Sequence, residues 1–234
     1  MKVESFEIGI GGEKIMNRFF SGINIEKIIL FCHGFPGTNR LVKLRPILAK
    51  KGVGFVEINY RGDKLSKGKF SFLGSMRDIR EVTKYLHLRY PNIKLRLLGY
   101  SCGAFYVMNL IKNNQGMFDK IILLNPLLDA KFLSDSPLMK ELWKSATITL
   151  KLRKKSFYDK EIKKINMSFN PLKLTYNLKV PIYIIQSQRD EVLPIDVAKI
   201  FHSKLGSRSK LIWIPNAKHD LNGNETELVE ALCK

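Results

Sequence analysis

The chain has 234 residues, of which 45% are hydrophobic and 26% charged, with 40 lysines and arginines against 21 aspartates and glutamates and a formal net charge of +19. This composition suits a globular protein with one sizeable core and excludes an intrinsically disordered chain. No apolar run approaches the ~20 residues that span a bilayer, and the first residues lack the features of a secretory signal, so we expect a cytoplasmic protein with no membrane span.

Short apolar runs alternate with helix-like segments along the chain. Strands are predicted at 3–10, 15–23, 27–34, 53–60, 93–100, 120–126 and 180–190, with a last strand and the loop after it at 209–220. Helices are predicted at 40–52, 75–91, 102–116, 195–206 and 225–234. The first two strands are expected to run antiparallel. Alternation of this kind predicts an α/β fold with a doubly wound, mostly parallel eight-stranded sheet and helices on both faces. Ligands bind such sheets at the carboxyl ends of the strands.

Residues 127–176 interrupt this alternation. They contain no obvious buried strand, and eleven lysines and arginines stand there against five aspartates and glutamates. We interpret the segment as amphipathic helices that lie over the rest of the molecule.

The net charge raises the question of a nucleic-acid partner. The sequence has no recognition-helix signature, no aromatic-interleaved RNA motif and no glycine–arginine tract. We therefore predict no specific nucleic-acid partner, and expect a solvated positive surface that attracts anions at low salt. The three cysteines, Cys32, Cys102 and Cys233, lack the spacing of a zinc site, so we predict free thiols and no metal.

A serine between two glycines, in Gly99-Tyr100-Ser101-Cys102-Gly103, lies where the fifth predicted strand becomes a helix. A sharp bend there strains the backbone of the serine, and glycine neighbours avoid side-chain clashes. The bend also sets Ser101 at a helix N-terminus, whose partial positive charge favours an alkoxide-like state. We predict a nucleophile elbow with Ser101 as the nucleophile, although a plain tight turn is the alternative.

A serine nucleophile needs a base to take its proton. Of the four histidines, only His219 combines a loop position with a place directly after a strand. His87 and His202 lie within predicted helices, and His33 is expected to brace its own loop. We therefore predict His219 as the base.

The imidazole in turn needs a carboxylate that fixes its tautomer. Asp190 follows the seventh predicted strand and is our first candidate, since the chain order Ser101, Asp190, His219 is the one expected of this fold. Asp129 after the sixth strand and Glu191 remain alternatives. Asp220, next to the histidine, is expected to serve the turn.

Acyl transfer also needs N–H donors for the oxyanion that develops on the carbonyl. One is expected from the main chain of Cys102, whose side chain should point into the helix packing rather than act as the nucleophile. The other is expected from the main chain of Phe35 in "HGFPG", although an ordinary glycine–proline turn is the alternative for that loop.

The chain resembles the α/β-hydrolase superfamily. Five segments carry the resemblance: "HGFPG", "INYRGDKLSKGKF", "GYSCG", "QSQRDEVLP" and "NAKHD". The stretch 33–72 looks most like its small esterases and acyl-peptidase-related members. Because "DKLSKG" departs from their pattern, the resemblance does not imply a substrate preference. The resemblance implies a core of residues 1–126 and 177–234, with a small helical cap at 127–176 inserted after the sixth strand.

These features predict a serine hydrolase that cleaves small-molecule carboxylic esters through an acyl-enzyme, without a cofactor. Phe35, Leu138, Leu142 and Trp143 are the expected substrate-binding residues, alongside Phe132 and Leu133, unless they only attach the cap to the core. A peptidase or acyl-aminoacyl hydrolase with the same triad is one alternative, and an inactive binding protein on the hydrolase fold is another. A homodimer is left open.

Overall fold

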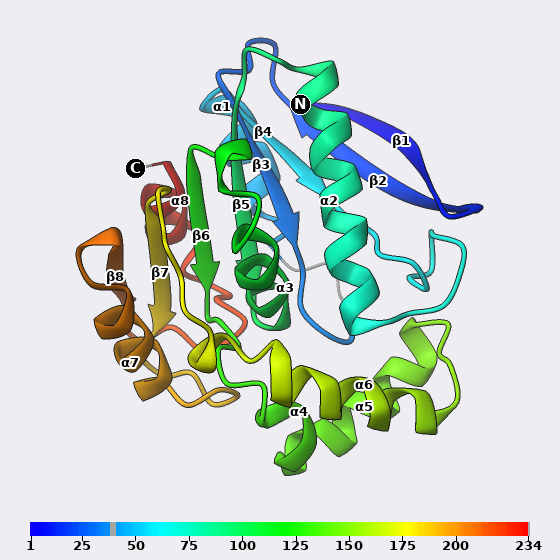
Figure 1. Cartoon of the computed structure of the whole chain (residues 1–234). Coiled ribbons are helices and arrows are strands. Elements are labelled where there is room, and N and C mark those ends of the chain that lie inside the picture. The colour runs from blue at the N-terminus through cyan, green and yellow to red at the C-terminus, as the bar shows by residue number, and fades with distance from the viewer. Residues whose placement is uncertain (38–40, 234) are drawn as a thin grey trace.

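The structure is a computed structural model that describes residues 1–37 and 41–233. Within them the centre is an eight-stranded sheet with the strand order β1-β2-β4-β3-β5-β6-β7-β8 (Figure 1). β2 pairs antiparallel with β1 and with β4, and the other neighbouring strands pair parallel, which confirms the predicted sheet. The strands are β1 (Lys2–Ile10), β2 (Glu13–Ser21), β3 (Lys27–Cys32), β4 (Val53–Glu57), β5 (Lys94–Tyr100), β6 (Lys120–Leu124), β7 (Ile182–Ser187) and β8 (Ser209–Ile214).

The strands differ in hydrophobicity because only the central ones are covered on both faces. Every residue of β4 and of β6 is buried, whereas the edge strand β1 is exposed along most of its length. β1 and β2 form a hairpin that turns at Gly11 and Gly12, whose φ angles are +57° and +83°. A two-residue hairpin turn requires such left-handed values, which glycine adopts without strain.

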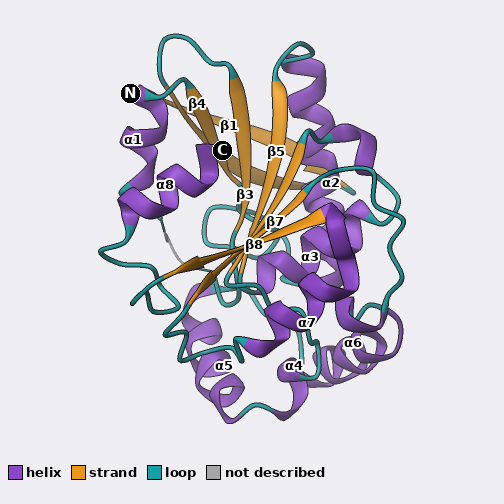
Figure 2. Cartoon of the chain, turned by 90° about the vertical axis from the view of Figure 1, so that its left-hand side faces the viewer, coloured by secondary structure: helices purple, strands orange, loops and turns teal. Residues whose placement is uncertain are grey.

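Helices cover both faces of the sheet. α1 and α8 lie on one face, and α2, α3 and α7 lie on the other, as Figures 1 and 2 show. The helices are α1 (Leu44–Lys50), α2 (Phe72–Arg89), α3 (Cys102–Ile111), α4 (Phe132–Asp135), α5 (Pro137–Thr149), α6 (Lys155–Ser168), α7 (Asp196–Leu205) and α8 (Glu225–Cys233).

Two helices begin three or more residues away from the predicted start, and α7 begins one residue after it, at Asp196. α1 begins at Leu44 rather than at residue 40, which lies outside the described residues. The start at Leu44 leaves Pro46 in the first turn, the part of a helix that tolerates proline. α2 begins at Phe72, three residues before the predicted start, because Ser71 caps it: its Oγ accepts the N–H of Gly74 at 2.9 Å.

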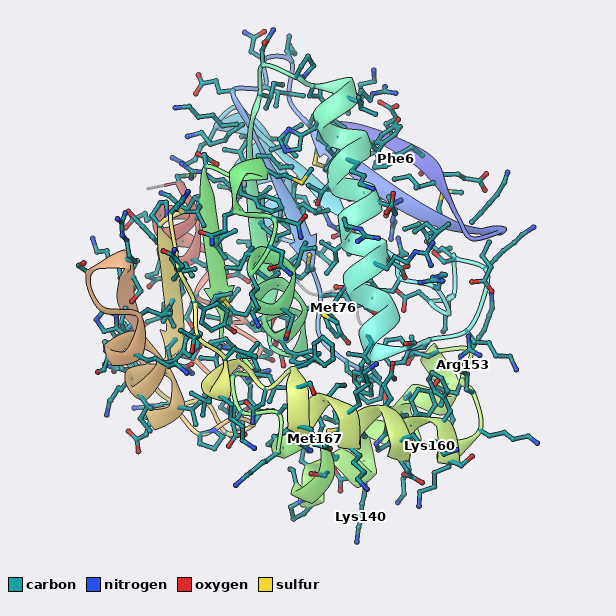
Figure 3. All side chains as sticks on the ribbon, viewed as in Figure 1. Phe6, Met76, Lys140, Arg153, Lys160 and Met167 are labelled. Atoms are coloured by element: carbon teal, nitrogen blue, oxygen red, sulfur yellow. The ribbon has the colours of Figure 1, made fainter. Side chains whose placement is uncertain are left out.

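Helices α4, α5 and α6 form the insertion between β6 and β7 and lie beyond the carboxyl ends of the strands (Figure 1). No strand of the sheet comes from the described residues of this segment. Figure 3 shows Lys140, Lys160 and Met167 on these helices at the lower edge of the molecule, and Met167 is 72% exposed. The basic residues of the insertion therefore contribute to the positive surface.

A buried carboxylate joins the insertion to the rest of the molecule. Glu161 of α6 is 6% exposed, and it accepts hydrogen bonds from the hydroxyl of Ser71 and from the N–H groups of Phe72 and Leu73, at 2.5 to 3.1 Å. It thus satisfies free donors at the N-terminus of α2, where a negative charge is favoured. The N-terminus of α2 is therefore stabilised by a side chain of the insertion.

Cys32, Cys102 and Cys233 are free. Among the described residues there is no group of three or more histidines, cysteines, aspartates or glutamates that could hold a metal ion. Over the same residues no helix is long and apolar enough to cross a membrane.

Candidate active site

Ser101 occupies the bend between β5 and α3 in a conformation that few serines adopt. Its φ and ψ are 53° and −120°, outside the regions that are comfortable for residues with a side chain. The neighbouring glycines fit this bend because a β-carbon on Gly103 would lie 1.9 Å from the carbonyl oxygen of Cys32, and one on Gly99 would lie 2.7 Å from Ala104 Cα. The close approach of helix and strand thus explains why glycine flanks the serine.

The loop after β3 lies against this bend. A β-carbon on Gly34 would come within 3.0 Å of Ser101 Cβ and 3.4 Å of its Oγ, so only glycine lets the loop approach the serine this closely. The main chain of the next residue, Phe35, lies near Cys102 and lowers the pKa of its thiol, against the larger effect of burial. Both main-chain groups predicted as oxyanion donors therefore belong to segments that meet beside Ser101.

His33 fixes the start of this loop from inside. Its Nε2 lies 2.9 Å from Asp63 Oδ2 and its Nδ1 lies 2.8 Å from the carbonyl oxygen of Gly34, while Asp63 Oδ2 also accepts the N–H of Tyr60. Burial alone would lower the pKa of His33, but the charge of Asp63 and the hydrogen bonds at both nitrogens outweigh it and raise the pKa. A protonated ring donates from both nitrogens, so it can hold the loop and Asp63 together.

His219 and Asp190 form the central polar contact of the site. His219 Nδ1 lies 2.8 Å from Asp190 Oδ2, and their side chains are only 8% and 0% exposed. A carboxylate oxygen can only accept, so Nδ1 carries the proton in this pair and a neutral ring keeps its lone pair on Nε2. This tautomer is the one that a general base needs.

Asp190 is itself held by several donors. Its Oδ1 accepts the N–H groups of Val192 and Leu193, both at 2.9 Å, and its Oδ2 accepts from Gln186 Nε2 at 3.1 Å. Burial alone would raise the pKa of Asp190, but the hydrogen bond and charge of His219 and these N–H groups lower it below the usual value. The carboxyl group is therefore ionised at neutral pH.

The other candidate acids lie elsewhere. Asp129 Oδ1 accepts from Asn170 Nδ2 and from the N–H of Lys131. Glu191 meets the main chain of His219 and not its ring, since Glu191 Oε2 accepts the N–H of His219 at 3.2 Å. Asp220 accepts from the backbone and side chain of Asn222 in the turn. Only Asp190, among these four acids, contacts the imidazole.

The remaining two histidines lie away from this pair. His87 Nε2 lies 2.6 Å from the carbonyl oxygen of Met117, and His202 Nδ1 lies 2.7 Å from the hydroxyl of Ser209. Both side chains belong to helices, as the sequence predicts.

The backbone of His219 is held by two side chains that the sequence analysis missed. Asn125 Nδ2 donates to its carbonyl oxygen at 2.8 Å and Tyr100 Oη donates to the same oxygen at 3.0 Å. Asn125 is fully buried, has a φ of 41°, and also exchanges hydrogen bonds with Ser187 at the end of β7. The signal in the sequence was its position directly after β6, where a polar residue follows a buried strand.

A cavity of about 130 Å³ brings the site together. Ser101, Cys102, Phe35 and His219 all line it. No hydrogen bond joins the Ser101 hydroxyl to the His219 ring within the part of the chain that the structure describes. The rest of the wall is largely apolar and includes Leu127, Phe132, Leu133, Leu138, Met139, Leu142, Val192 and Leu193.

Trp143 does not line this cavity, unlike the other residues predicted to bind substrate. Its ring packs edge-on against Phe35, with 4.9 Å between the ring centroids, and against Phe72 and Tyr158. The helical pattern of α5 gives the buried face of the helix but does not tell which residues of that face reach the cavity. Trp143 supports the wall from behind.

The thiol of Cys102 is unsuited to nucleophilic attack. Its side chain is buried, and its Sγ donates to Tyr106 Oη at 3.4 Å. Burial raises the pKa of the thiol to about 12, although Tyr106 and the N–H of Phe35 act in the opposite direction. Because the thiolate is the reactive form, this sulfur is inert at neutral pH.

A comparison with known protein families shows to which family the chain belongs. A family model described as serine aminopeptidase, S33 (Hydrolase_4), matches residues 23–174, more than half of the sequence. The chain belongs to this family of α/β hydrolases. A second model, PhoPQ-activated pathogenicity-related protein, matches residues 148–234 of the hydrolase.

One curated relative matches a short stretch of the hydrolase. Over 56 residues it is 38% identical to the uncharacterized peptidase YuxL of Bacillus subtilis (strain 168). The match covers 23% of this chain and 8% of YuxL, so the hydrolase corresponds to a small part of that longer protein.

Solved structures share the fold over nearly the whole hydrolase. Est1E from Butyrivibrio proteoclasticus with ferulic acid bound has a TM-score of 0.76 at 18% identity, covering 97% of this chain and 96% of that one. An alpha-beta serine hydrolase homologue from Coxiella burnetii has a TM-score of 0.68 at 21% identity, covering 98% and 95%. These likenesses confirm the predicted α/β-hydrolase fold.

Proposed function

We propose that this protein is a serine hydrolase that cleaves carboxylic esters through an acyl-enzyme intermediate. The observation that carries the proposal is the buried hydrogen bond between His219 Nδ1 and Asp190, made by a histidine that lines one cavity together with Ser101. The strained backbone of Ser101 supports it, because such strain is found where a side chain must be aimed at a reacting group.

In the first half-reaction Ser101 Oγ attacks the ester carbonyl carbon and gives its proton to His219 Nε2. The carbonyl oxygen becomes an oxyanion, which the N–H groups of Cys102 and Phe35 stabilise. The C–O bond to the alcohol then breaks, and the alcohol leaves with the proton from Nε2. Apo sites often hold the nucleophile and base loosely, and we expect substrate to bring the two into contact.

In the second half-reaction water gives a proton to His219 Nε2 and attacks the acyl carbon. The bond to Ser101 Oγ breaks, the serine regains its proton from Nε2, and the carboxylic acid leaves. Asp190 stays ionised throughout and stabilises the imidazolium that forms in each half-reaction. The lowered pKa of Asp190 is consistent with a carboxylate that stays ionised through both half-reactions.

The wall of the cavity favours a neutral, apolar acyl or aryl group. Phe132, Leu133, Leu138 and Leu142 of the insertion line the same cavity as Ser101 and His219. Burying a charged group there without a partner would cost several kcal/mol. Est1E, of the same fold, binds ferulic acid, an aromatic acid, which agrees with an aryl or alkyl ester as the substrate.

Peptide cleavage is the second candidate, since the family model and YuxL both carry peptidase names. An aminopeptidase needs an acidic group that binds the free amine of its substrate. The described residues that line the cavity include no aspartate or glutamate, and Glu161 of α6 already accepts three hydrogen bonds at the start of α2. This favours esters over peptides with a free N-terminus.

Labelling with a fluorophosphonate probe and a substrate panel test the proposal. The wild type should be labelled at Ser101 and should hydrolyse p-nitrophenyl acetate and butyrate faster than aminoacyl p-nitroanilides. Ser101→Ala should lose the labelling and nearly all turnover while it unfolds at the same temperature. A wild type that resists the probe would instead indicate an inactive binding protein, and preference for the anilides would indicate a peptidase.

A further inference from the structure

A second, larger pocket adjoins the cavity that contains Ser101. Its volume is about 350 Å³, and it lies between the chain after β6 and the chain that leads from β7 into α7. Leu127, Phe132 and Leu193 line both this pocket and the first cavity. The two spaces are therefore separated by single side chains.

The shared wall lies directly on the serine. The N–H of Leu127 donates to the carbonyl oxygen of Ser101 at 2.9 Å, so the backbone that begins the second pocket is hydrogen-bonded to the backbone of the elbow. Leu193 is a second residue of the shared wall, and its N–H is one of the donors to Asp190. Leu127 and Leu193 thus connect the wall of the second pocket to the backbone of Ser101 and to Asp190.

Most of the residues that line the pocket are apolar, and Asp129, Lys131 and Ser136 add polar groups. Leu127, Leu128 and Leu193 are at most 7% exposed, and Val197 of α7 contributes further apolar wall. Lys131 and Pro194, which also line the pocket, are exposed, so the pocket is open to solvent. Such a pocket suits a hydrocarbon group whose far end reaches solvent.

We propose that this pocket binds the distal apolar part of the substrate, an alkyl or aryl group that extends beyond the first cavity from one side of the scissile bond. The inference rests on the proposed ester hydrolysis and extends it to substrate length. Phe132, the half-buried member of the shared wall, is then the residue that the chain must pass.

A variant that fills the pocket tests the inference. Val197→Trp adds an indole to the second pocket only, since Val197 does not line the first cavity. Two ester series are compared: p-nitrophenyl esters from acetate to decanoate, and acetate esters of methanol to decanol. The two series distinguish an acyl chain from an alcohol chain. Ile200→Trp is the matched control, because Ile200 lies on the same helix and is 59% exposed.

In the wild type each methylene that enters the second pocket should raise kcat/KM by about fourfold. Val197→Trp should lower the ratio of kcat/KM between the longest and the shortest ester by more than about tenfold in one of the two series, while Ile200→Trp keeps the wild-type ratio. That ratio is decanoate to acetate in the acyl series and decyl to methyl in the alcohol series. Phe132→Ala widens the passage and should shift the preferred length to longer chains in that same series, so it tests the inference should Val197→Trp fail to fold.

Length ratios that do not change in the variants would overturn the inference. A folded Val197→Trp variant, labelled by fluorophosphonate at the wild-type rate, with unchanged length ratios in both series would show that no substrate chain enters the second pocket. Unchanged ratios in Phe132→Ala would agree with that result. By contrast, a wild type without ester hydrolysis or labelling would refute the proposed function itself, and the inference with it.

Discussion

Asn125 donates a hydrogen bond from Nδ2 to the main-chain carbonyl oxygen of His219 at 2.8 Å, although 94 residues separate them in the chain. The amide oxygen of the same side chain accepts the N–H of Ser187 at 2.7 Å. One buried amide thus joins the ends of β6 and β7 to the loop that carries the histidine. A histidine placed by buried hydrogen bonds keeps its ring oriented before substrate arrives.

Substitution of Asn125 should reduce turnover more than substrate binding. Asn125→Gly keeps the left-handed φ but removes the amide, and we expect kcat to fall by about 10- to 100-fold because small displacements of a catalytic group cost that much. The unpaired polar groups should lower the free energy of unfolding by about 1–3 kcal/mol. Steady-state kinetics with p-nitrophenyl butyrate and thermal unfolding measure both.

Asn125→Ala separates the hydrogen bonds from the backbone conformation. Alanine loses the same amide and adds the cost of a positive φ, about 1 kcal/mol of further destabilisation. Equal losses of kcat in the alanine and glycine variants are expected. Near-normal turnover in Asn125→Gly would show that the backbone conformation, and not the amide, matters for His219.

Asp190→Asn should reduce kcat by about three to four orders of magnitude, because an amide can donate to Nδ1 and stabilise the wrong tautomer. Asp129→Asn is the matched control, since Asp129 also follows a strand but contacts Asn170 and Lys131 instead of His219. The control should hydrolyse p-nitrophenyl butyrate within about threefold of the wild-type rate. Equal defects in the two variants would contradict the pairing of Asp190 with His219.

The stabilising contribution of His33 should depend on pH. Its pKa is raised in the folded protein, and the unfolded reference is about 6.5. A raised imidazole pKa gives stability that is fully present below the unfolded value and is lost as pH rises through the folded value. The melting temperature of the wild type should therefore exceed that of His33→Gln by more at pH 6 than at pH 9.

His202→Gln is the control for the loss of a histidine side chain, since the His202 ring contacts the hydroxyl of Ser209 and is not the partner of Asp63. A His33→Gln difference that stays constant or grows from pH 6 to pH 9 would be incompatible with a protonated ring between Asp63 and Gly34.

The sequence predicted the sheet well because strands that are buried on both faces consist of continuous runs of apolar residues. The predicted strands at 27–34 and 120–126 start at the same residues as β3 and β6 and run two residues past their ends. The same logic brought Asp190 and His219 forward, since each follows a predicted strand and polar residues at those places converge at one edge of the sheet.

Partners that lie far apart in the sequence could not be predicted. Tyr100 and Asn125 contact His219 across 119 and 94 residues, and Glu161 reaches Ser71 across 90. No local sequence pattern around these residues identifies a contact partner so far away in the chain. Trp143 illustrates the same limit, because helical periodicity gives a buried face without identifying the space in front of it.

The carboxylate of Glu161 has a consequence for how the molecule denatures. Helix α2 packs on the sheet, and its first turn is completed by a side chain of α6 instead of by its own segment alone. Melting of the insertion would leave those donors unsatisfied, so the loss of one part weakens the other. We expect a single cooperative transition by calorimetry, and two separate transitions for Glu161→Ala.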